Sequence, residues 1–370
     1  MSAVEGEAIV YCERAFGTTN GKTAHGLVRR SERYRVVAII DSRHSGKDAG
    51  EVLDGKPAGI PILRSLEATL TFAATKGEAP THFVIGLAPD GGRLPEFARR
   101  DVMWAIEQGL NIVSGLHDFL GDDPAMAVAA ASHAVTIHDV RKPPPPNELH
   151  FFSGKIEAVR CLKVAALGTD SAVGKRTTAW LLKDALEERG WSAELVGTGQ
   201  TAWIQGARFG TVVDSIVSDF VAGEIEHAVW SAWKEARPDV LLLEGQGSLM
   251  NPAYPGGFEL LAAGRPDVIV LQHAPARKDY DGFPGYRIHP LRKQIKALEL
   301  ISGKPVVAVT LNHENLSATT LDEAKKKIAR DTELVVCDPL QDGCGVVVRV
   351  LEPFLGFEKR PLHGRAECVE

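Results

Sequence analysis

The sequence predicts an α/β protein with two domains, an N-terminal Rossmann-like domain followed by a P-loop NTPase-like parallel α/β domain. Three observations predict this fold. Continuous apolar runs alternate with amphipathic stretches of helical period, which is typical of parallel sheets covered by helices on both faces. Four consecutive prolines, at 143–146, favour an extended linker. At 370 residues, the chain is also longer than one hydrophobic core usually supports.

The first domain is predicted over residues 1–140. Its strands are predicted from the apolar runs EAIVYCE, RYRVVAIIDS, THFVIGLAP and LNIVSGLHD, and its helices from KTAHGLVRRS and EFARRDVMWAIEQG. The loop TTNGKTAHG (18–26) opens a helix with Gly, Lys and Thr, a composition suited to an anion. Asp41 ends the second strand where a nucleotide-binding acid would lie, but the absence of GxGxxG argues against NAD. Lys22 and Asp41 are equally well explained as ordinary loop residues.

A linker is predicted at 141–155 and the second domain at 156–360. This domain begins with the strand CLKVAALGTD and the amphipathic helix KRTTAWLLKDALEERG. Further buried strands are predicted from SAELVGTGQ, DVLLLEGQG, PDVIVLQH and KPVVAVTLNH. Each ends in polar or glycine residues, and open α/β sheets bind ligands at the carboxyl ends of their strands. The ligand site is therefore expected at that edge.

Composition excludes several classes of function. The formal charge of −6 gives no electrostatic reason to expect nucleic acid as a partner. The five cysteines show no CxxC spacing, which argues against a zinc site and suits a reducing compartment. No run of 18 apolar residues and no signal peptide is visible, so we expect a cytoplasmic protein that does not enter a membrane.

A glycine-rich loop in the second domain is the strongest functional signal. It has the character of the phosphate-binding motif GxxxxGK[ST], with one extra residue between its glycines and Arg176 where the motif has Ser or Thr. Small residues let main-chain N–H groups surround an anion, while the helix N-terminus and Lys175 add positive charge. The predicted cofactor-binding residues are Gly168, Thr169, Asp170, Ser171, Ala172, Val173, Gly174, Lys175, Arg176, Thr177 and Thr178.

Polar residues at other strand ends are candidates for catalysis or binding. Glu244 follows an apolar strand, as acids that hold magnesium or an attacking water do, and Thr177 or Thr178 would supply the matching hydroxyl. VGTGQTAW (196–203) offers groups that recognise a carboxylate or an amide. The predicted substrate-binding residues there are Thr198, Gln200 and Thr201. Further candidates are Ser114 and His117, and one of Asp214 and Asp219 for contact with a ligand or metal.

A long connection at 271–290 is the remaining candidate, because loops of this length are often binding or lid segments. His273 has an ordinary pKa near neutrality and is a candidate general base. The guanidinium forks of Arg277 and Arg287 suit a substrate carboxylate.

Several of these motifs resemble known proteins. GTDSAVGK is similar to the loop of dethiobiotin synthetase, a P-loop enzyme with the pattern GTDxxVGKT. Together with GTGQTAW, VSDFVAGEIE, EGQGSL and GFPGY, the chain resembles a family of two-domain P-loop proteins, formerly of unknown function, that includes D-glutamate N-acetyltransferases. The resemblance covers nearly the whole chain and implies a homodimer. Arg176 departs from the magnesium-binding Thr of dethiobiotin synthetase, which favours gripping a phosphate over hydrolysing ATP.

Three hypotheses follow. The first is an N-acyltransferase that moves an acetyl group from acetyl-CoA to the amine of an acidic amino acid. In it, the loop around Lys175 holds the cofactor phosphates, Glu244 or His273 accepts the proton, and Arg277 or Arg287 binds the carboxylate. The second is an ATP-dependent ligase that activates a carboxylate, with magnesium on Thr177 and Glu244 and with Lys175 as a catalytic residue that stabilises the transferred phosphoryl group. The third is a nucleotide sensor without catalysis, which would act through a protein partner.

Overall fold

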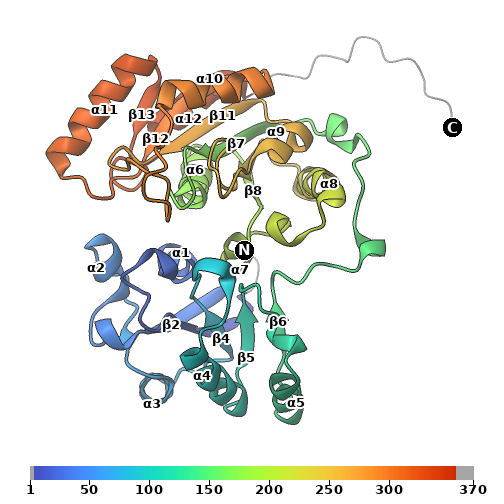
Figure 1. The fold of residues 1–370 in the computed structure, drawn as a ribbon, viewed down its shortest axis with the longest axis vertical. Coiled ribbons are helices and arrows are strands. Elements are labelled where there is room, and N and C mark those ends of the chain that lie inside the picture. The colour runs from blue at the N-terminus through green and yellow to red at the C-terminus, as the bar shows by residue number, and fades with distance from the viewer. Residues whose placement is uncertain (1–3, 356–370) are drawn as a thin grey trace. The chain divides into compact units, whose positions relative to one another are not determined.

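The structure, a computed structural model, describes residues 4–355 and has the predicted α/β class (Figure 1). Two compact units make up the chain. The first comprises the chain up to Phe151 together with Gly197–Ile225, and the second comprises Phe152–Val196 and the chain from Glu226 onward. Each unit is built on a parallel sheet, which confirms the prediction of a Rossmann-like domain followed by a P-loop domain.

The sheet of the first unit has the strand order β3-β2-β1-β4-β5-β6. Its strands are β1 (Gly6–Tyr11), β2 (Tyr34–Ile40), β3 (Ile62–Leu63), β4 (His82–Ile85), β5 (Asn111–Ser114) and β6 (Ile137–Asp139). Figure 1 shows it flanked by α1 (Lys22–Arg29), α2 (Ala49–Asp54), α3 (Leu66–Lys76), α4 (Glu96–Glu107) and α5 (Pro124–Ser132). This order reverses direction between β1 and β4, as Rossmann folds do.

The core of this unit follows from its apolar strands. Ile9 in β1, Phe83 in β4 and Ile112 in β5 are fully buried, because helices cover both faces of the sheet. Tyr11 ends β1 and is also buried, and its hydroxyl donates a hydrogen bond of 2.7 Å to Asp101 of α4. The polar end of this large side chain is thus satisfied within the core.

A stretch that lies between two strands of the second sheet in sequence packs in the first unit. This inserted segment, Gly197–Ile225, contains α7 (Gln200–Gln205) and also β9 (Phe209–Gly210), a two-residue strand at the edge of the second sheet. Trp203 stacks on His138 with ring centroids 4.4 Å apart, and the Arg33 guanidinium lies 3.8 Å from the Trp203 ring. The Gln205 amide donates hydrogen bonds to the carbonyl oxygens of Gly26 (2.8 Å) and Arg30 (3.0 Å), which closes the end of α1.

The second sheet has the strand order β13-β12-β11-β7-β10-β8-β9. Its other strands are β7 (Leu162–Gly168), β8 (Ala193–Gly197), β10 (Val240–Glu244), β11 (Val268–His273), β12 (Val306–Leu311) and β13 (Val335–Cys337). Its helices are α6 (Lys175–Glu188), α8 (Ser218–Ala236), α9 (Phe258–Gly264), α10 (Leu291–Ser302), α11 (Ala318–Thr332) and α12 (Gly345–Leu351). Every residue of β7 and β10 is buried, so helices must cover both faces of the sheet at its centre.

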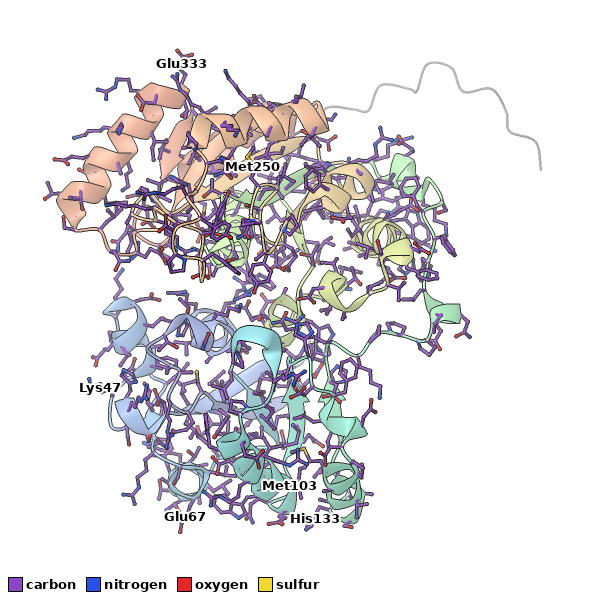
Figure 2. All side chains as sticks on the ribbon, viewed as in Figure 1. Lys47, Glu67, Met103, His133, Met250 and Glu333 are labelled. Carbon is purple, nitrogen blue, oxygen red and sulfur yellow. The ribbon has the colours of Figure 1, made fainter. Side chains whose placement is uncertain are left out.

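The loops that leave β7, β10, β11 and β12 start from the same edge of this sheet, because the four strands are parallel. Figure 2 shows Met250, which marks the loop after β10, among the side chains of the second unit.

Within residues 4–355, no helix is both long and apolar enough to cross a membrane.

Candidate functional site

The loop between β7 and α6 has a backbone shaped for an anion. Ala172 and Gly174 both take positive φ values, 49° and 105°, which turns successive peptide groups of the loop in new directions. Such left-handed residues are typical of the concave nests of N–H groups that bind phosphate. The N–H of Thr178 bonds to the carbonyl of Gly174, one of the first bonds of α6. The N–H groups before it therefore have no acceptor within the helix and can serve an anion.

Lys175 lies across this loop instead of extending into solvent. It is only 7% exposed, and its Nζ donates to the carbonyl oxygens of Asp170 at 2.7 Å and Gly247 at 2.8 Å. A Cβ on Gly168 would come within 2.8 Å of the Lys175 Cδ and 3.0 Å of its Nζ. The glycine at 168 is therefore required for the lysine to fold back over the loop, which concentrates positive charge at the helix N-terminus.

A buried ion pair fixes the shape of the loop. Asp170 is fully buried and accepts hydrogen bonds from the Ser171 N–H (2.7 Å), Asn251 Nδ2 (2.8 Å), Arg277 Nη1 (2.9 Å) and the Asp281 N–H (2.9 Å). These donors come from the loops that follow β7, β10 and β11. Asp170 thus ties three loops together at the edge of the sheet, and its charge is matched by a guanidinium.

Arg277 uses all five of its N–H donors in the same cluster. Nη1 bonds to Asp170 and to the Ser171 carbonyl (2.8 Å), and Nη2 bonds to the Ala172 carbonyl (3.2 Å) and to Glu314 (3.0 Å). Nε bonds to the other Glu314 oxygen. Since an arginine has five such hydrogens, no donor remains for another group unless a contact breaks. Arg277 therefore acts in this structure as a clamp on the phosphate-binding loop.

The three threonines of the loop region differ in the hydrogen bonds that their hydroxyl groups make. Thr178 is buried, and its hydroxyl donates to Gln272 Oε1 at 2.6 Å. Thr169 is fully buried and shares a hydrogen bond of 2.9 Å with His273 Nδ1. Thr177 is half-buried and forms no hydrogen bond through its hydroxyl to the residues that the structure describes. Of the two hydroxyls predicted for phosphate or magnesium, the Thr177 hydroxyl is thus the one with donor and acceptor capacity left.

Glu244 and His273 end the strands on either side of β7. Glu244 is 4% exposed and lies opposite Ala166 in the register of β10 and β7, two residues before Gly168. His273 follows Gln272, which lies opposite Gly168 in the register of β11 and β7. Burial lowers the pKa of His273 to about 4, so its ring is neutral at physiological pH. The fold thus brings both candidate bases to the strand ends that flank the phosphate-binding loop.

The long connection after β11 is an ordered loop. Asp279 and Arg287 form a short antiparallel bridge, and the Tyr280 N–H bonds to the Tyr286 carbonyl at 2.9 Å. The Arg287 side chain is 71% exposed, with its Nε 3.6 Å from Asp279 Oδ1. Unlike Arg277, it keeps donors that face solvent.

The remaining predicted residues lie in the first unit. Thr198, Gln200 and Thr201 belong to the inserted segment, where the Thr201 hydroxyl shares a hydrogen bond of 3.1 Å with Thr23. Asp41 is fully buried and accepts hydrogen bonds from the N–H groups of Arg14 and Arg43 and from the His44 ring. These bonds account for Asp41 as a structural residue. Lys22 begins α1 and is exposed.

Sequence reasoning missed the residues that hold the loop from a distance. Asn251, Gln272 and Glu314 all lie at strand ends or in the loops after them, which was the available signal. Asn251 bonds to Asp170 and Gln272 to Thr178 over 81 and 94 residues, and Glu314 bonds to Arg277 over 37, so no local sequence motif predicts these contacts.

Comparison with known proteins agrees with this architecture. Two family models match, a Rossmann-like domain of unknown function (DUF1611_N) at residues 42–143 and a P-loop domain of unknown function (DUF1611_C) at residues 150–348. A D-glutamate N-acetyltransferase from Tritonibacter scottomollicae is 30% identical over 297 residues, 76% of this chain and 84% of that protein. A protein of the same name from a Pseudoalteromonas species is 31% identical over 298 residues, 78% of this chain and 86% of the relative.

A solved structure extends the likeness to three dimensions. A crystal structure of a DUF1611 family protein from Anabaena variabilis superposes with a TM-score of 0.85 at 30% identity, covering 94% of this chain and 99% of that one. The fold, the phosphate-binding loop and both family models point to one group of proteins. The chain belongs to the DUF1611 family, which joins an N-terminal Rossmann-like domain to a C-terminal P-loop domain.

Proposed function

We propose that this protein is an N-acyltransferase that moves an acetyl group from acetyl-CoA to the amine of an acidic amino acid such as D-glutamate. The observation that carries the proposal is the phosphate-binding loop with Lys175 folded over it, in a chain 30% and 31% identical to two proteins named D-glutamate N-acetyltransferase. Coenzyme A carries a pyrophosphate and a further phosphate, so the loop has a ligand of the right charge without phosphoryl transfer.

The loop residues fit a phosphate group better than they fit a magnesium-bound one. The position directly after Lys175 is a cation, Arg176, where the motif usually has a hydroxyl that binds magnesium. The Thr178 hydroxyl is already donated to Gln272. We propose that the N–H groups at the start of α6, with Lys175, would hold the phosphates of acetyl-CoA, whose thioester supplies an activated acyl group.

Transfer requires removal of a proton from the attacking ammonium group. As the nitrogen bonds to the acyl carbon, the carbon–sulfur bond breaks and the sulfur leaves with the electron pair as the thiolate of coenzyme A, which then takes up one of the protons lost by the amine. His273 is a poor acceptor for that proton, because burial lowers its pKa to about 4. We propose Glu244 as the base: its charge attracts the ammonium group, and its buried place at the strand end limits competition from water.

The substrate carboxylate needs a cation with donors to spare. Arg277 does not meet this condition, because its five donors already bond to Asp170, Glu314 and the loop carbonyls. Of the two arginines expected in this role, we therefore propose Arg287, which is exposed.

A product screen by mass spectrometry tests the function. The purified protein is incubated with D- and L-forms of glutamate and aspartate, with acetyl-CoA alone and separately with ATP and magnesium. We expect an N-acetyl amino acid from acetyl-CoA without ATP, reduced at least about a hundredfold in Lys175→Ala and in Glu244→Gln. Formation of ADP with one of the acids, and no product from acetyl-CoA, would instead show an ATP-dependent ligase.

A further inference from the structure

We infer that the first unit contains a carboxylate-binding site made by Arg141 and Gln200, in which Asp214 occupies the place of a ligand carboxylate. The identity of the ligand, an acidic amino acid, rests on the proposed function. A planar guanidinium binds a carboxylate through paired hydrogen bonds. All the residues of this site lie within the first unit.

The cation of the site, Arg141, is buried and held in place by a main-chain hydrogen bond. Arg141 follows β6, is 8% exposed, and donates from Nε to the Gly115 carbonyl at 2.7 Å. Its Nη1 is buried, and no acceptor among the described residues meets it with hydrogen-bond geometry, although the Asp214 carboxylate lies within ion-pairing distance. A buried guanidinium is costly unless an anion faces it, so this position favours a carboxylate that can approach in line with its N–H groups.

The anion now paired with it is placed differently. Asp214 lies in a single 3₁₀ turn, Val213–Ser215, and its side chain is 43% exposed, whereas the Arg141 side chain is 10% exposed. Because the Asp214 carboxylate is already partly hydrated, it loses little when it leaves the guanidinium and returns to water. A ligand carboxylate can therefore replace Asp214 while Arg141 stays in place.

A second polar group, Gln200, contacts the same residue as Arg141 does, Gly115. Gln200 begins α7 and is 8% exposed, and its side-chain amide makes no hydrogen bond to the residues that the structure describes. A Cβ on Gly115 would lie 2.7 Å from the Gln200 Cγ, so the absence of a side chain at 115 lets Gln200 reach the residue whose carbonyl orients Arg141. The donor and acceptor of this amide therefore remain available to a ligand.

A histidine, His117, also lies near the Arg141 guanidinium. His117 follows β5, as Gly115 does, and burial, with the Arg141 charge as the next contribution, lowers its pKa. The lowered pKa favours the neutral imidazole, which adds no second positive charge near Arg141. A planar guanidinium with an amide donor is the arrangement that recognises a carboxylate.

The test measures binding of glutarate, a dicarboxylate without an amine that cannot be acetylated. Calorimetry compares the full-length chain with Arg141→Lys, Arg141→Gln, Asp214→Ala and, as a matched control, Asp219→Ala. Asp219 is another exposed acid of the inserted segment, and among the described residues it has no ion pair. We expect Arg141→Gln to weaken binding at least about tenfold, Arg141→Lys to weaken it less, and Asp214→Ala to strengthen it about threefold or more.

The signs of these changes decide the inference. Stronger binding in Asp214→Ala is expected only if this carboxylate competes with the ligand. Weaker binding in both Asp214→Ala and Arg141→Gln would show that the pair is structural, and would overturn the site, as would unchanged binding in Arg141→Gln or none in the parent chain. Because glutarate binding needs no acetyl transfer, failure of the proposed function and failure of this site are separate results.

Discussion

At the scale of single residues, the ion pair between Arg277 and Asp170 at the phosphate-binding loop predicts how a substitution changes the affinity for coenzyme A. Arg277 joins Asp170 to the carbonyl oxygens of the loop through a planar group with five donors. Lysine keeps the charge but has one nitrogen, so Arg277→Lys cannot hold Asp170, Glu314 and two carbonyls together. We expect it to weaken coenzyme A binding by about tenfold to a hundredfold, with folding retained. Titration calorimetry against the parent chain measures this.

Control variants separate the clamp from a direct role in binding substrate. Arg287→Lys changes an exposed arginine of the same connection and is expected to leave coenzyme A affinity unchanged. A clamp predicts a higher KM for acetyl-CoA with the KM for the amino acid nearly constant. The opposite pattern, a raised KM for the amino acid alone, would mean that Arg277 binds substrate.

His273 makes a prediction about stability and pH. Its pKa in the folded chain is about 4, below the value near 6.5 of an unfolded histidine. Between these values the unfolded chain binds the extra proton, so the free energy of unfolding falls as pH falls from about 6.5 to 4, by up to about 3 kcal/mol. Denaturant unfolding at a series of pH values measures the loss, which should be smaller in His273→Gln. If the free energy of unfolding depended on pH equally in the parent chain and in His273→Gln, the lowered pKa of His273 would be contradicted.

At the scale of elements, the contacts of α7 explain its place in the fold. This helix follows β8 of the second sheet in sequence but belongs to the first unit. Trp203 lies between the His138 ring and the Arg33 guanidinium, and Gln205 caps the end of α1. We expect Trp203→Ala to lower the free energy of unfolding of the first unit by about 3 kcal/mol, with Trp203→Phe less affected. Hydrogen exchange should rise in α1 and not in α6. Equal protection of α1 from exchange in the parent chain and in Trp203→Ala would show that Trp203 does not stabilise this helix.

The elements themselves were largely predictable from the sequence, and their partners were not. Apolar runs identified strands such as β7 and β10, and the Gly168–Lys175 pattern located the phosphate-binding loop, because strand burial and loop geometry depend on nearby residues. The clamp of Asp170 by Arg277 joins positions 107 residues apart. VGTGQTAW has the same local pattern whichever sheet it packs on, so the sequence could not tell that α7 would pack on α1.

At the scale of the whole molecule, the chain passes between its two units three times, at 151/152, 196/197 and 225/226. Neither unit is a continuous segment, so one cut in the proline-rich linker does not separate them. Cleavage there leaves Gly197–Ile225 on the C-terminal fragment, while its contacts with α1, such as Gln205 with Gly26, lie in the first unit. The first unit would then consist of two chains held by buried apolar surface.

This organisation predicts the behaviour of a nicked protein. A protease site inserted at the exposed residues 144–148 is cleaved after folding, and the product is examined by size-exclusion chromatography. We expect the two fragments to elute together under native conditions and to separate only in denaturant. With Trp203→Ala added they should come apart at lower denaturant, because the inserted segment then binds its unit more weakly. Fragments that separate in buffer alone would mean that Gly197–Ile225 adds little to the first unit, and that its residues up to 151 fold without it.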